Sequence, residues 1–246
     1  MKKIAFIPAR YAATRFPAKL MQLIGGKPVI RYTYEQVVSM HLFDEVVVVT
    51  DSDIIFNEII SNGGRAVMSK KEHESGSDRI AEAVAGMDVD VIINVQGDEP
   101  FIQREPLEKL LGIFEDTSVQ VGSLMRKISA AEAADPNMVK VVTDLAGNAL
   151  YFSRSPIPYP RSGEKHAHYH LHVGVYGYRK PALMAFTAWA VTPAEQTEKL
   201  EQLRYLENGV KIRMASTTHT TIAIDTPEDL SRAIDWHSKN VLHQHP

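Results

Sequence analysis

The sequence predicts an α/β protein built on a doubly wound, mostly parallel sheet. Short β-branched apolar runs alternate with segments of helical periodicity through the first half of the chain. The runs at 46–49 (VVVV) and 91–95 (VIINV) are apolar on both faces, which is typical of strands covered by helices on each side. Glycine and proline separate these segments where helices are expected to begin or end.

The first half supplies a regular series of expected elements. Strands are predicted at 4–7, 46–50, 66–68, 91–95 and 119–124. Pro28 opens a helix over 29–40, because proline suits the start of a helix. A second helix over 53–62 ends at Gly63, since glycine tolerates the left-handed conformation that closes helices.

The second half changes character and predicts a smaller lobe at about 125–215, within a single domain over 1–246. Strands are expected at 139–143, 149–152 and 173–178, and the segment 159–168 is expected to be a loop rich in proline, glycine and charge. The last helix is predicted to start at Thr226 and Pro227, a capping hydroxyl followed by proline, and to run to about residue 239.

The composition excludes several classes of protein. Lys and Arg total 27 against 30 Asp and Glu, so a net charge of −3 lacks the positive excess of a general nucleic-acid binder. Cysteine is absent, which excludes disulfides, thiolate nucleophiles and cysteine-ligated metal centres. The apolar stretch after Lys3 is too short for a signal peptide, and 181–193 falls short of the ~20 residues that span a bilayer. A cytoplasmic protein with no membrane or nucleic-acid partner is expected.

The segment 7–19 (IPARYAATRFPAK) follows the first expected strand, where open α/β sheets bind their ligands. Arg10, Arg15 and Lys19 supply three cations there, enough to collect the charges of a triphosphate. The alternative is a solvated basic loop. The segment has neither the glycine pattern of a P-loop nor that of a dinucleotide site, which argues against an ATPase or a nicotinamide dehydrogenase.

Two acidic motifs also lie beside expected strand ends. The segment 94–100 (NVQGDEP) carries Asp98, and 223–230 (AIDTPEDL) carries Asp225 just before the last helix. Mg²⁺ takes one or two protein carboxylates together with substrate phosphates, so the two aspartates are suited to share one ion. Ordinary turn chemistry explains the first motif without a metal, and helix capping explains the second.

Several other polar side chains are candidates for binding a ligand. In 73–79 (HESGSDR), Ser77 and Arg79 offer hydrogen bonds, although a capped helix explains half of that motif. Arg154 in 150–158 (LYFSRSPIP) is suited to hold a carboxylate. His172 and the pair Glu201 and Gln202 suit a hydroxyl-rich acceptor, against the alternatives of a structural histidine and a helix-surface glutamate. The H-x-H-x-H run at 166–170 favours adventitious metal binding over function.

Seven motifs in order across 7–230 resemble the 3-deoxy-manno-octulosonate (Kdo) cytidylyltransferase family. They are IPARYAATRFPAK, HESGSDR, NVQGDEP, ALYFSRSPIP, GVYGYR, LEQLR and IDTPEDL. The resemblance implies a nucleotidyltransferase fold with a smaller inserted lobe for sugar binding and dimerisation. It implies a Mg²⁺-dependent reaction in which the anomeric hydroxyl of Kdo attacks the α-phosphate of CTP. The products are CMP-Kdo for lipopolysaccharide assembly and pyrophosphate, and the protein is expected to be a homodimer.

The resemblance also implies roles for individual residues. Binding of CTP is expected at Ala9, Arg10, Arg15, Lys19, Ser77 and Arg79, with the backbone of Ala9 and Arg79 at the cytosine end. Asp98 and Asp225 are the expected metal ligands, and with Arg10 and Lys19 they form the expected catalytic set. The acceptor pocket is expected to contain Gln96, Arg154, His172, Tyr178, Glu201 and Gln202. We expect the metal, rather than His172 acting as a base, to acidify the attacking hydroxyl.

Two positions depart from the family pattern, which usually has serine at residue 13 and glycine at residue 18. Ala13 removes a hydroxyl contact, and Ala18 restricts backbone angles that glycine allows, so altered or weaker CTP binding is expected. Two alternatives stay open. One is a cytidylyltransferase for a related acidic or amino sugar, such as an 8-amino analogue of Kdo, and the other is a catalytically silent nucleotide-binding homologue.

Overall fold

The computed structural model describes residues 1–12, 16–73, 75–163, 168–220 and 222–240. The chain forms two compact units. The first contains Met1–Arg104 together with the segment from Thr220 onward, and the second contains Glu105–His219. The lobe expected at 125–215 lies within the second unit. No helix in the described ranges has both the length and the apolar character needed to cross a membrane.

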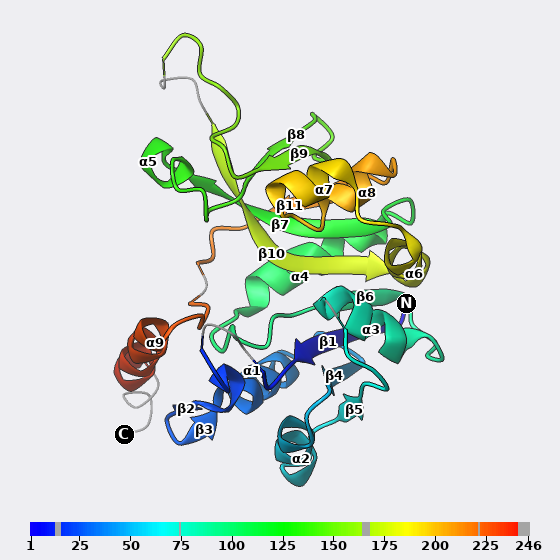
Figure 1. Ribbon diagram of the computed structural model, residues 1–246, viewed down its shortest axis with the longest axis vertical. Coiled ribbons are helices and arrows are strands. Elements are labelled where there is room, and N and C mark those ends of the chain that lie inside the picture. Colours follow the sequence, from blue (N-terminus) through cyan, green and yellow to red (C-terminus); the bar gives the residue numbers. More distant parts are fainter. Residues whose placement is uncertain (13–15, 74, 164–167, 221, 241–246) are drawn as a thin grey trace. The chain divides into compact units, whose positions relative to one another are not determined.

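The first unit is built on a parallel sheet. Its strands, in spatial order, are β6 (Val91–Asn94), β1 (Lys3–Ala9), β4 (Glu45–Thr50) and β5 (Ala66–Met68) (Figure 1). All four coincide with predicted strands to within two residues. β6 is buried at every position and β4 at five of six, as expected for strands with helices on both sides.

The helices of this unit make the sheet doubly wound, as predicted. α1 (Val29–Ser39) connects β1 to β4 and α2 (Asp53–Ser61) connects β4 to β5, in one direction across the sheet. α3 (Gly76–Val84) then leads to β6 on the other side of β1. Because such crossovers are right-handed, the reversal places α3 on the opposite face from α1 and α2. The reversal also creates a switch point between β1 and β6, where open sheets bind ligands.

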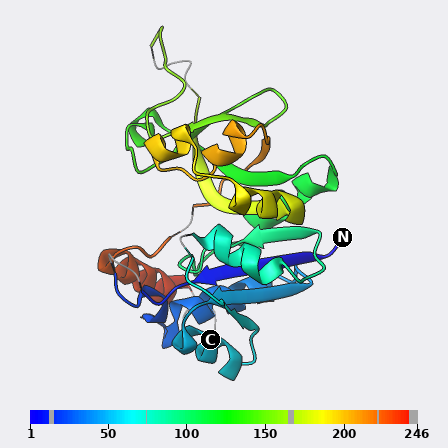
Figure 2. The same ribbon diagram turned by 45° about the vertical axis from the view of Figure 1, so that its right-hand side comes forward.

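Short elements follow the carboxyl end of β1. The 3-10 helix η1 (Lys19–Met21) and the hairpin of β2 (Leu23–Ile24) and β3 (Lys27–Pro28) follow β1. The last helix, α9 (Pro227–Asn240), begins one residue after the predicted capping Thr226 and packs beside β2 (Figure 2). At the contact Gly25 has φ +58°, and a Cβ there would lie 2.4 Å from Cε1 of His237, so only glycine fits.

The second unit contains a mixed sheet. Its strands are β7 (Val121–Ile128), β8 (Lys140–Thr143), β9 (Ala149–Ser153), β10 (Tyr169–Arg179) and β11 (Ile212–Ser216). β10 runs antiparallel to β7 and β8, β9 is antiparallel to β8, and β11 is parallel to β7. A bulge interrupts β10, because Val173 pairs with Leu124 whereas Tyr176 pairs with Ser123. Two residues of β10, at 174 and 175, therefore have no counterpart on β7.

The helices of the second unit are short. They are α4 (Arg104–Gly112), η2 (Ile113–Glu115), α5 (Ala130–Ala133), α6 (Lys180–Ala188), α7 (Pro193–Glu198) and α8 (Leu203–Glu207). The strand predicted at 119–124 starts two residues later, and that predicted at 173–178 starts four residues earlier, at Tyr169. Part of the loop predicted at 159–168, residues 164–167 with His166, lies outside the described residues.

Candidate active site

One lysine joins two aspartates that are distant in sequence. Nζ of Lys19 lies 2.5 Å from Oδ2 of Asp98 and 3.0 Å from Oδ1 of Asp225. Lys19 begins η1 after β1, Asp98 lies in the loop after β6, and Asp225 precedes α9. The structure thus brings three of the four residues predicted as catalytic to one place beside the β1/β6 switch point.

Backbone contacts hold the two acidic segments together. The amide of Ile224 donates to the carbonyl of Asp98 at 3.0 Å, which fixes the residue next to Asp225. The amide of Asp225 donates to Oδ2 of Asp229 in the first turn of α9. Gly97 packs closely on β1, since a Cβ there would lie 3.3 Å from the carbonyl oxygen of Pro8. The start of α9 therefore positions Asp225 instead of using its side chain as the cap.

The aspartates beside the switch point shift the pKa values of the ionisable groups around them. Burial by itself lowers the pKa of Lys19, but the negative charges of Asp98 and Asp225 outweigh it and raise that pKa above its usual value. Burial raises the pKa of Glu99 to about 8, and the neighbouring charge of Asp98 adds to the rise. Glu99 is therefore mainly protonated at neutral pH, and Asp98 and Asp225 are the carboxylates available to a cation.

These two carboxylates fit a Mg²⁺ site. Within the described part of the chain, no three histidine, cysteine, aspartate or glutamate side chains come together as a ligand set. Mg²⁺ needs fewer, because it keeps several waters and takes substrate phosphates as further ligands. Asp98 and Asp225 already share one cation, the ammonium of Lys19, so their oxygens are arranged around a positive charge.

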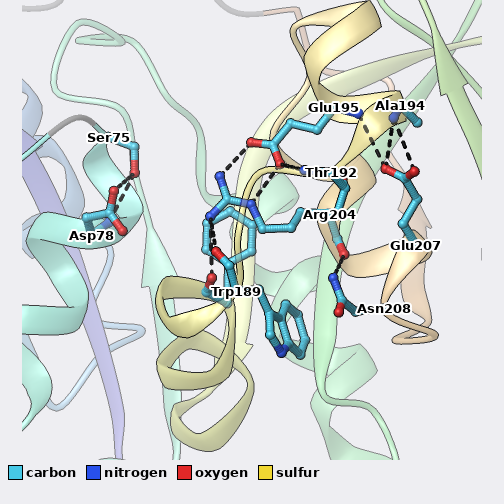
Figure 3. Close-up of polar contacts among 10 residues, drawn as sticks. Ser75, Asp78, Trp189, Thr192, Ala194, Glu195, Arg204, Glu207 and Asn208 are labelled. Atoms are coloured by element: carbon cyan, nitrogen blue, oxygen red, sulfur yellow. Dashed lines mark hydrogen bonds and ion pairs between the residues drawn. The ribbon is translucent and has the colours of Figure 1, made fainter.

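A buried arginine marks the predicted cytosine end. Arg79 on α3 is 4% exposed, donates to the carbonyl of Ala9 at 2.5 Å and pairs with Asp51 at 2.6 Å. Ser75 caps α3, with its Oγ accepting from the amide of Asp78 (Figure 3). Ser77 is buried in the first turn of that helix. The capped helix that explains half of this motif is therefore present. Its cap fixes the start of α3 and so the position of Arg79 in the first turn.

The remaining predicted residues of the first unit are less constrained. Arg10 is exposed directly after β1, and Gln96 follows β6 with Nε2 3.5 Å from Oδ1 of Asn94. Arg15 and Ala13 lie outside the described residues. Ala18 has φ +53°, so the position where the family resemblance implies a glycine adopts a left-handed conformation in this chain.

The second unit groups a histidine with several tyrosines. The ring of His172 lies 5.0 Å from that of Phe152 and 5.3 Å from that of Tyr176. Tyr178, predicted at the acceptor site, is buried and stacks between Tyr176 and Tyr205. Burial lowers the pKa of His172 to about 4, so this ring is uncharged at neutral pH.

Buried polar atoms without partners accompany this aromatic group. Among the described residues, Oη of Tyr176, Oη of Tyr205 and Nε2 of Gln202 have no hydrogen-bond partner. Buried polar atoms are nearly always paired, so these three atoms are candidates to bind water or a polar ligand. Tyr176 and Tyr205 were not predicted from the sequence.

An ion pair fixes the segment that carries Glu201 and Gln202. Arg204 on α8 reaches Glu195 on α7 through Nε at 2.7 Å and Nη2 at 2.5 Å, a forked pairing of two largely buried groups (Figure 3). Its guanidinium also lies 4.2 Å from the ring centroid of Phe186. Glu201 is exposed and Gln202 buried, and both lie in the turn before α8, so the alternative of a surface glutamate beside a helix stays open.

Arg154 is largely occupied by the protein itself. Its Nε donates to the carbonyl of Glu198 at 2.8 Å, and Nη1 donates to the carbonyl of Pro136 at 3.1 Å. Its own carbonyl accepts from the fully buried Lys140 at 2.6 Å. These contacts fix the segment after β9, and a role for Arg154 in binding a carboxylate stays a prediction.

Comparisons with known proteins identify the family to which this chain belongs. The cytidylyltransferase family profile matches residues 4–212, so the chain is a cytidylyltransferase. A 3-deoxy-manno-octulosonate cytidylyltransferase of Flavobacterium johnsoniae is 60% identical, over 95% of this chain and 97% of that protein. One from Christiangramia forsetii is 52% identical, over 94% of each. This chain belongs to the 3-deoxy-manno-octulosonate cytidylyltransferase family, as the seven motifs predicted.

A solved structure agrees over nearly the whole chain. CMP:2-keto-3-deoxy-manno-octonic acid synthetase complexed with CTP has a TM-score of 0.94 and 41% sequence identity, covering 98% of this chain and 100% of that one. The predicted fold class is confirmed by this match.

Proposed function

We propose that this protein transfers CMP from CTP to the anomeric hydroxyl of Kdo. The hydroxyl oxygen forms a bond to the α-phosphorus, the bond to the β-phosphate oxygen breaks, pyrophosphate leaves, and the hydroxyl proton passes to water. The observation that carries the proposal is the pair of carboxylates, Asp98 and Asp225, gathered around one cation beside a switch point. The relatives' names and the CTP complex of the similar structure support the choice of substrates.

Positioning and charge neutralisation do most of the work in such a transfer. In the proposal Arg10, Arg15 and Lys19 neutralise the triphosphate and stabilise charge on the departing pyrophosphate. Arg79 is held by Asp51 and the carbonyl of Ala9, which gives the cytosine end a rigid wall. The acceptor sugar is proposed to bind among the unpartnered polar atoms of Tyr176, Tyr205 and Gln202.

Mg²⁺ is the proposed cofactor, with Asp98 and Asp225 as its protein ligands. When bound, it supplies positive charge that polarises the phosphate oxygens and acidifies a nearby hydroxyl. His172 is a poor candidate for a general base, because burial lowers its pKa to about 4 and leaves it weakly basic at neutral pH. A pH–rate profile whose limb disappears in His172→Gln would contradict this assignment.

The experiment that tests the function is pyrophosphate release from CTP and Mg²⁺, with and without Kdo. We expect Kdo-dependent release that falls by at least about 100-fold in Asp98→Asn, with CTP still bound by calorimetry. The matched control is Asp116→Asn, an exposed carboxylate outside the site, which keeps full activity. No release with Kdo despite CTP binding would overturn the proposal, and release with the 8-amino analogue alone would assign the other acceptor.

We further propose a homodimer that works in the cytoplasm, where CTP is supplied, and that provides CMP-Kdo for lipopolysaccharide assembly. Exposed apolar side chains on the β8–β9 hairpin, Leu145, Leu150 and Tyr151, support a contact between copies there. Light scattering on a size-exclusion column tests it. We expect a mass of two chains that falls to one in Leu150→Lys, and a wild-type mass of one chain would contradict the dimer.

A further inference from the structure

A buried serine contacts the histidine of the second unit. Ser123 on β7 is fully buried, and its Oγ lies 3.1 Å from Nε2 of His172 on β10. The same oxygen lies 2.9 Å from the carbonyl oxygen of Val175 and 3.2 Å from that of Val173. Three polar atoms therefore surround one hydroxyl.

The β10 bulge creates this arrangement. Val173 and Tyr176 pair with the adjacent residues Leu124 and Ser123, so 174 and 175 are extra on their strand. In a regular ladder the backbone carbonyls of a strand face amides of a neighbouring strand. Here the carbonyl oxygens of Val173 and Val175 both lie within hydrogen-bond distance of Oγ of Ser123.

The count of hydrogens decides the direction of each bond. A serine hydroxyl has one hydrogen to donate, and a carbonyl oxygen can only accept. If the hydrogen pointed to His172, two carbonyl oxygens would face the lone pairs of Oγ. The hydroxyl therefore donates to a carbonyl, most directly that of Val175 at 2.9 Å, and Nε2 of His172 must carry the hydrogen that Oγ accepts.

We infer that Ser123 is a positioning residue that holds His172 in its Nε2–H tautomer, so that Nδ1 accepts a hydrogen bond from a hydroxyl of the acceptor sugar. The sugar part of this inference rests on the proposed function. In a neutral imidazole with hydrogen on one nitrogen, the other nitrogen offers a lone pair. The rings of Phe152 and Tyr176 limit rotation of the imidazole, so its orientation and its tautomer are set together.

The surroundings match a hydroxyl-rich ligand. Tyr176 Oη and Tyr205 Oη each offer a donor and an acceptor, and Gln202 Nε2 offers donors. Nδ1 of His172 can only accept in this tautomer, so it adds a point at which a hydroxyl of the ligand must donate. A site of this kind discriminates against analogues that lack the matching hydroxyl, because its buried groups would then stay unpaired.

The tautomer is tested directly by long-range ¹H–¹⁵N correlation spectra of histidine-labelled protein at neutral pH without substrates. The signal of His172 is assigned by its loss in His172→Gln. We expect Nε2 protonated and Nδ1 unprotonated in the wild type and in Ser123→Thr, which keeps the hydroxyl, and loss of this preference in Ser123→Ala. A wild-type spectrum with hydrogen on Nδ1 would overturn the inference.

Kinetics test the link to the acceptor. We expect Ser123→Ala to raise KM for Kdo by roughly tenfold and to leave KM for CTP within about twofold, with recovery in Ser123→Thr. The matched control is Ser129→Ala, which removes the cap of α5 and lowers stability without moving either the spectrum or KM for Kdo. An unchanged KM for Kdo in Ser123→Ala would overturn the sugar contact. If the wild type releases no pyrophosphate with Kdo, the proposed function and the sugar contact fail together, whereas the spectrum still decides the tautomer.

Discussion

Nζ of Lys19 lies 2.5 Å from Oδ2 of Asp98, and the same ammonium also reaches Asp225. The lysine predicted to bind the triphosphate therefore pairs with both carboxylates predicted to bind the metal, and its single charge offsets one of their two negative charges. In the proposed site, a metal ion and Lys19 would compete for the same oxygens. A triphosphate that attracts Lys19 would release these carboxylates, so nucleotide and metal are expected to bind cooperatively.

Replacing Lys19 by methionine should separate these two effects. We expect Lys19→Met to bind Mg²⁺ more tightly than the wild type in the absence of nucleotide, by about tenfold, because the competing charge is gone. The same variant should bind CTP more weakly, since one phosphate partner is lost. Calorimetric titrations with Mg²⁺ alone and with CTP alone measure both. Lys27→Met, which removes a lysine paired with Glu35, is the control, and equal Mg²⁺ affinity in wild type and Lys19→Met would contradict the competition.

Asp51 should matter for CTP although it was not predicted as a site residue. Asp51→Asn removes the charge that orients the buried Arg79, so we expect the Kd for CTP to rise about tenfold, with a smaller change in kcat. Calorimetry with CTP and steady-state kinetics provide the measurements. Glu58→Gln breaks another arginine–carboxylate pair, with Arg31, and should leave CTP binding unchanged. Normal CTP affinity in Asp51→Asn would show that Arg79 needs no partner.

Ala18→Gly should stabilise the protein. Ala18 has φ +53°, a conformation that costs an alanine roughly 1 kcal/mol and a glycine little, so the free energy of unfolding should rise by about 0.5–1 kcal/mol. Urea unfolding measures the change. Ala131→Gly in the helical part of α5 should have the opposite sign, because glycine weakens helices. A destabilised Ala18→Gly variant would show that the methyl group makes contacts that outweigh its strain.

His172 should make stability depend on pH below neutrality. Burial lowers its pKa from about 6.5 to about 4 in the folded protein. Above pH ~6.5 both states are neutral and the residue contributes no pH dependence. Between about pH 6.5 and 4 the unfolded chain binds a proton that the folded one does not, so the free energy of unfolding falls, by up to about 3 kcal/mol. Urea unfolding across this range should show a shallower fall in His172→Gln, and equal slopes would contradict the assignment.

The sequence predicted the first unit well, because its strands are determined by local composition. β1, β4 and β6 are largely apolar runs buried on both faces, a pattern typical of parallel strands covered by helices, whereas β5 is a short strand of intermediate burial. In the second unit, Tyr169–Arg179 alternates histidine with apolar residues, and its partners rather than its propensities make it a long strand. β11 and the short helices α7 and α8 carried no clear periodic signal for the same reason.

The site could be predicted where chemistry coincides with a strand end or a helix start. Lys19, Asp98 and Asp225 satisfy that rule, and their meeting point follows from the parallel topology. Asp51 satisfies it too, since it directly follows the VVVVT run, and this signal could have revealed it. Ser123 could not be found in this way, because its contact with His172 exists only through the bulge, which the sequence does not show.

The bulge in β10 also limits how this strand can change length. His172, Tyr176 and Tyr178 lie opposite Met125, Ser123 and Val121, alternate residues of β7, so all three share one face of the sheet. Two extra residues preserve that alternation, whereas one would reverse it. Losing a single residue here would turn either the histidine or both tyrosines to the other face, whereas losing both would keep every side chain on its own side. Related sequences should therefore gain or lose residues of this strand two at a time, because successive side chains alternate between the two faces of the sheet.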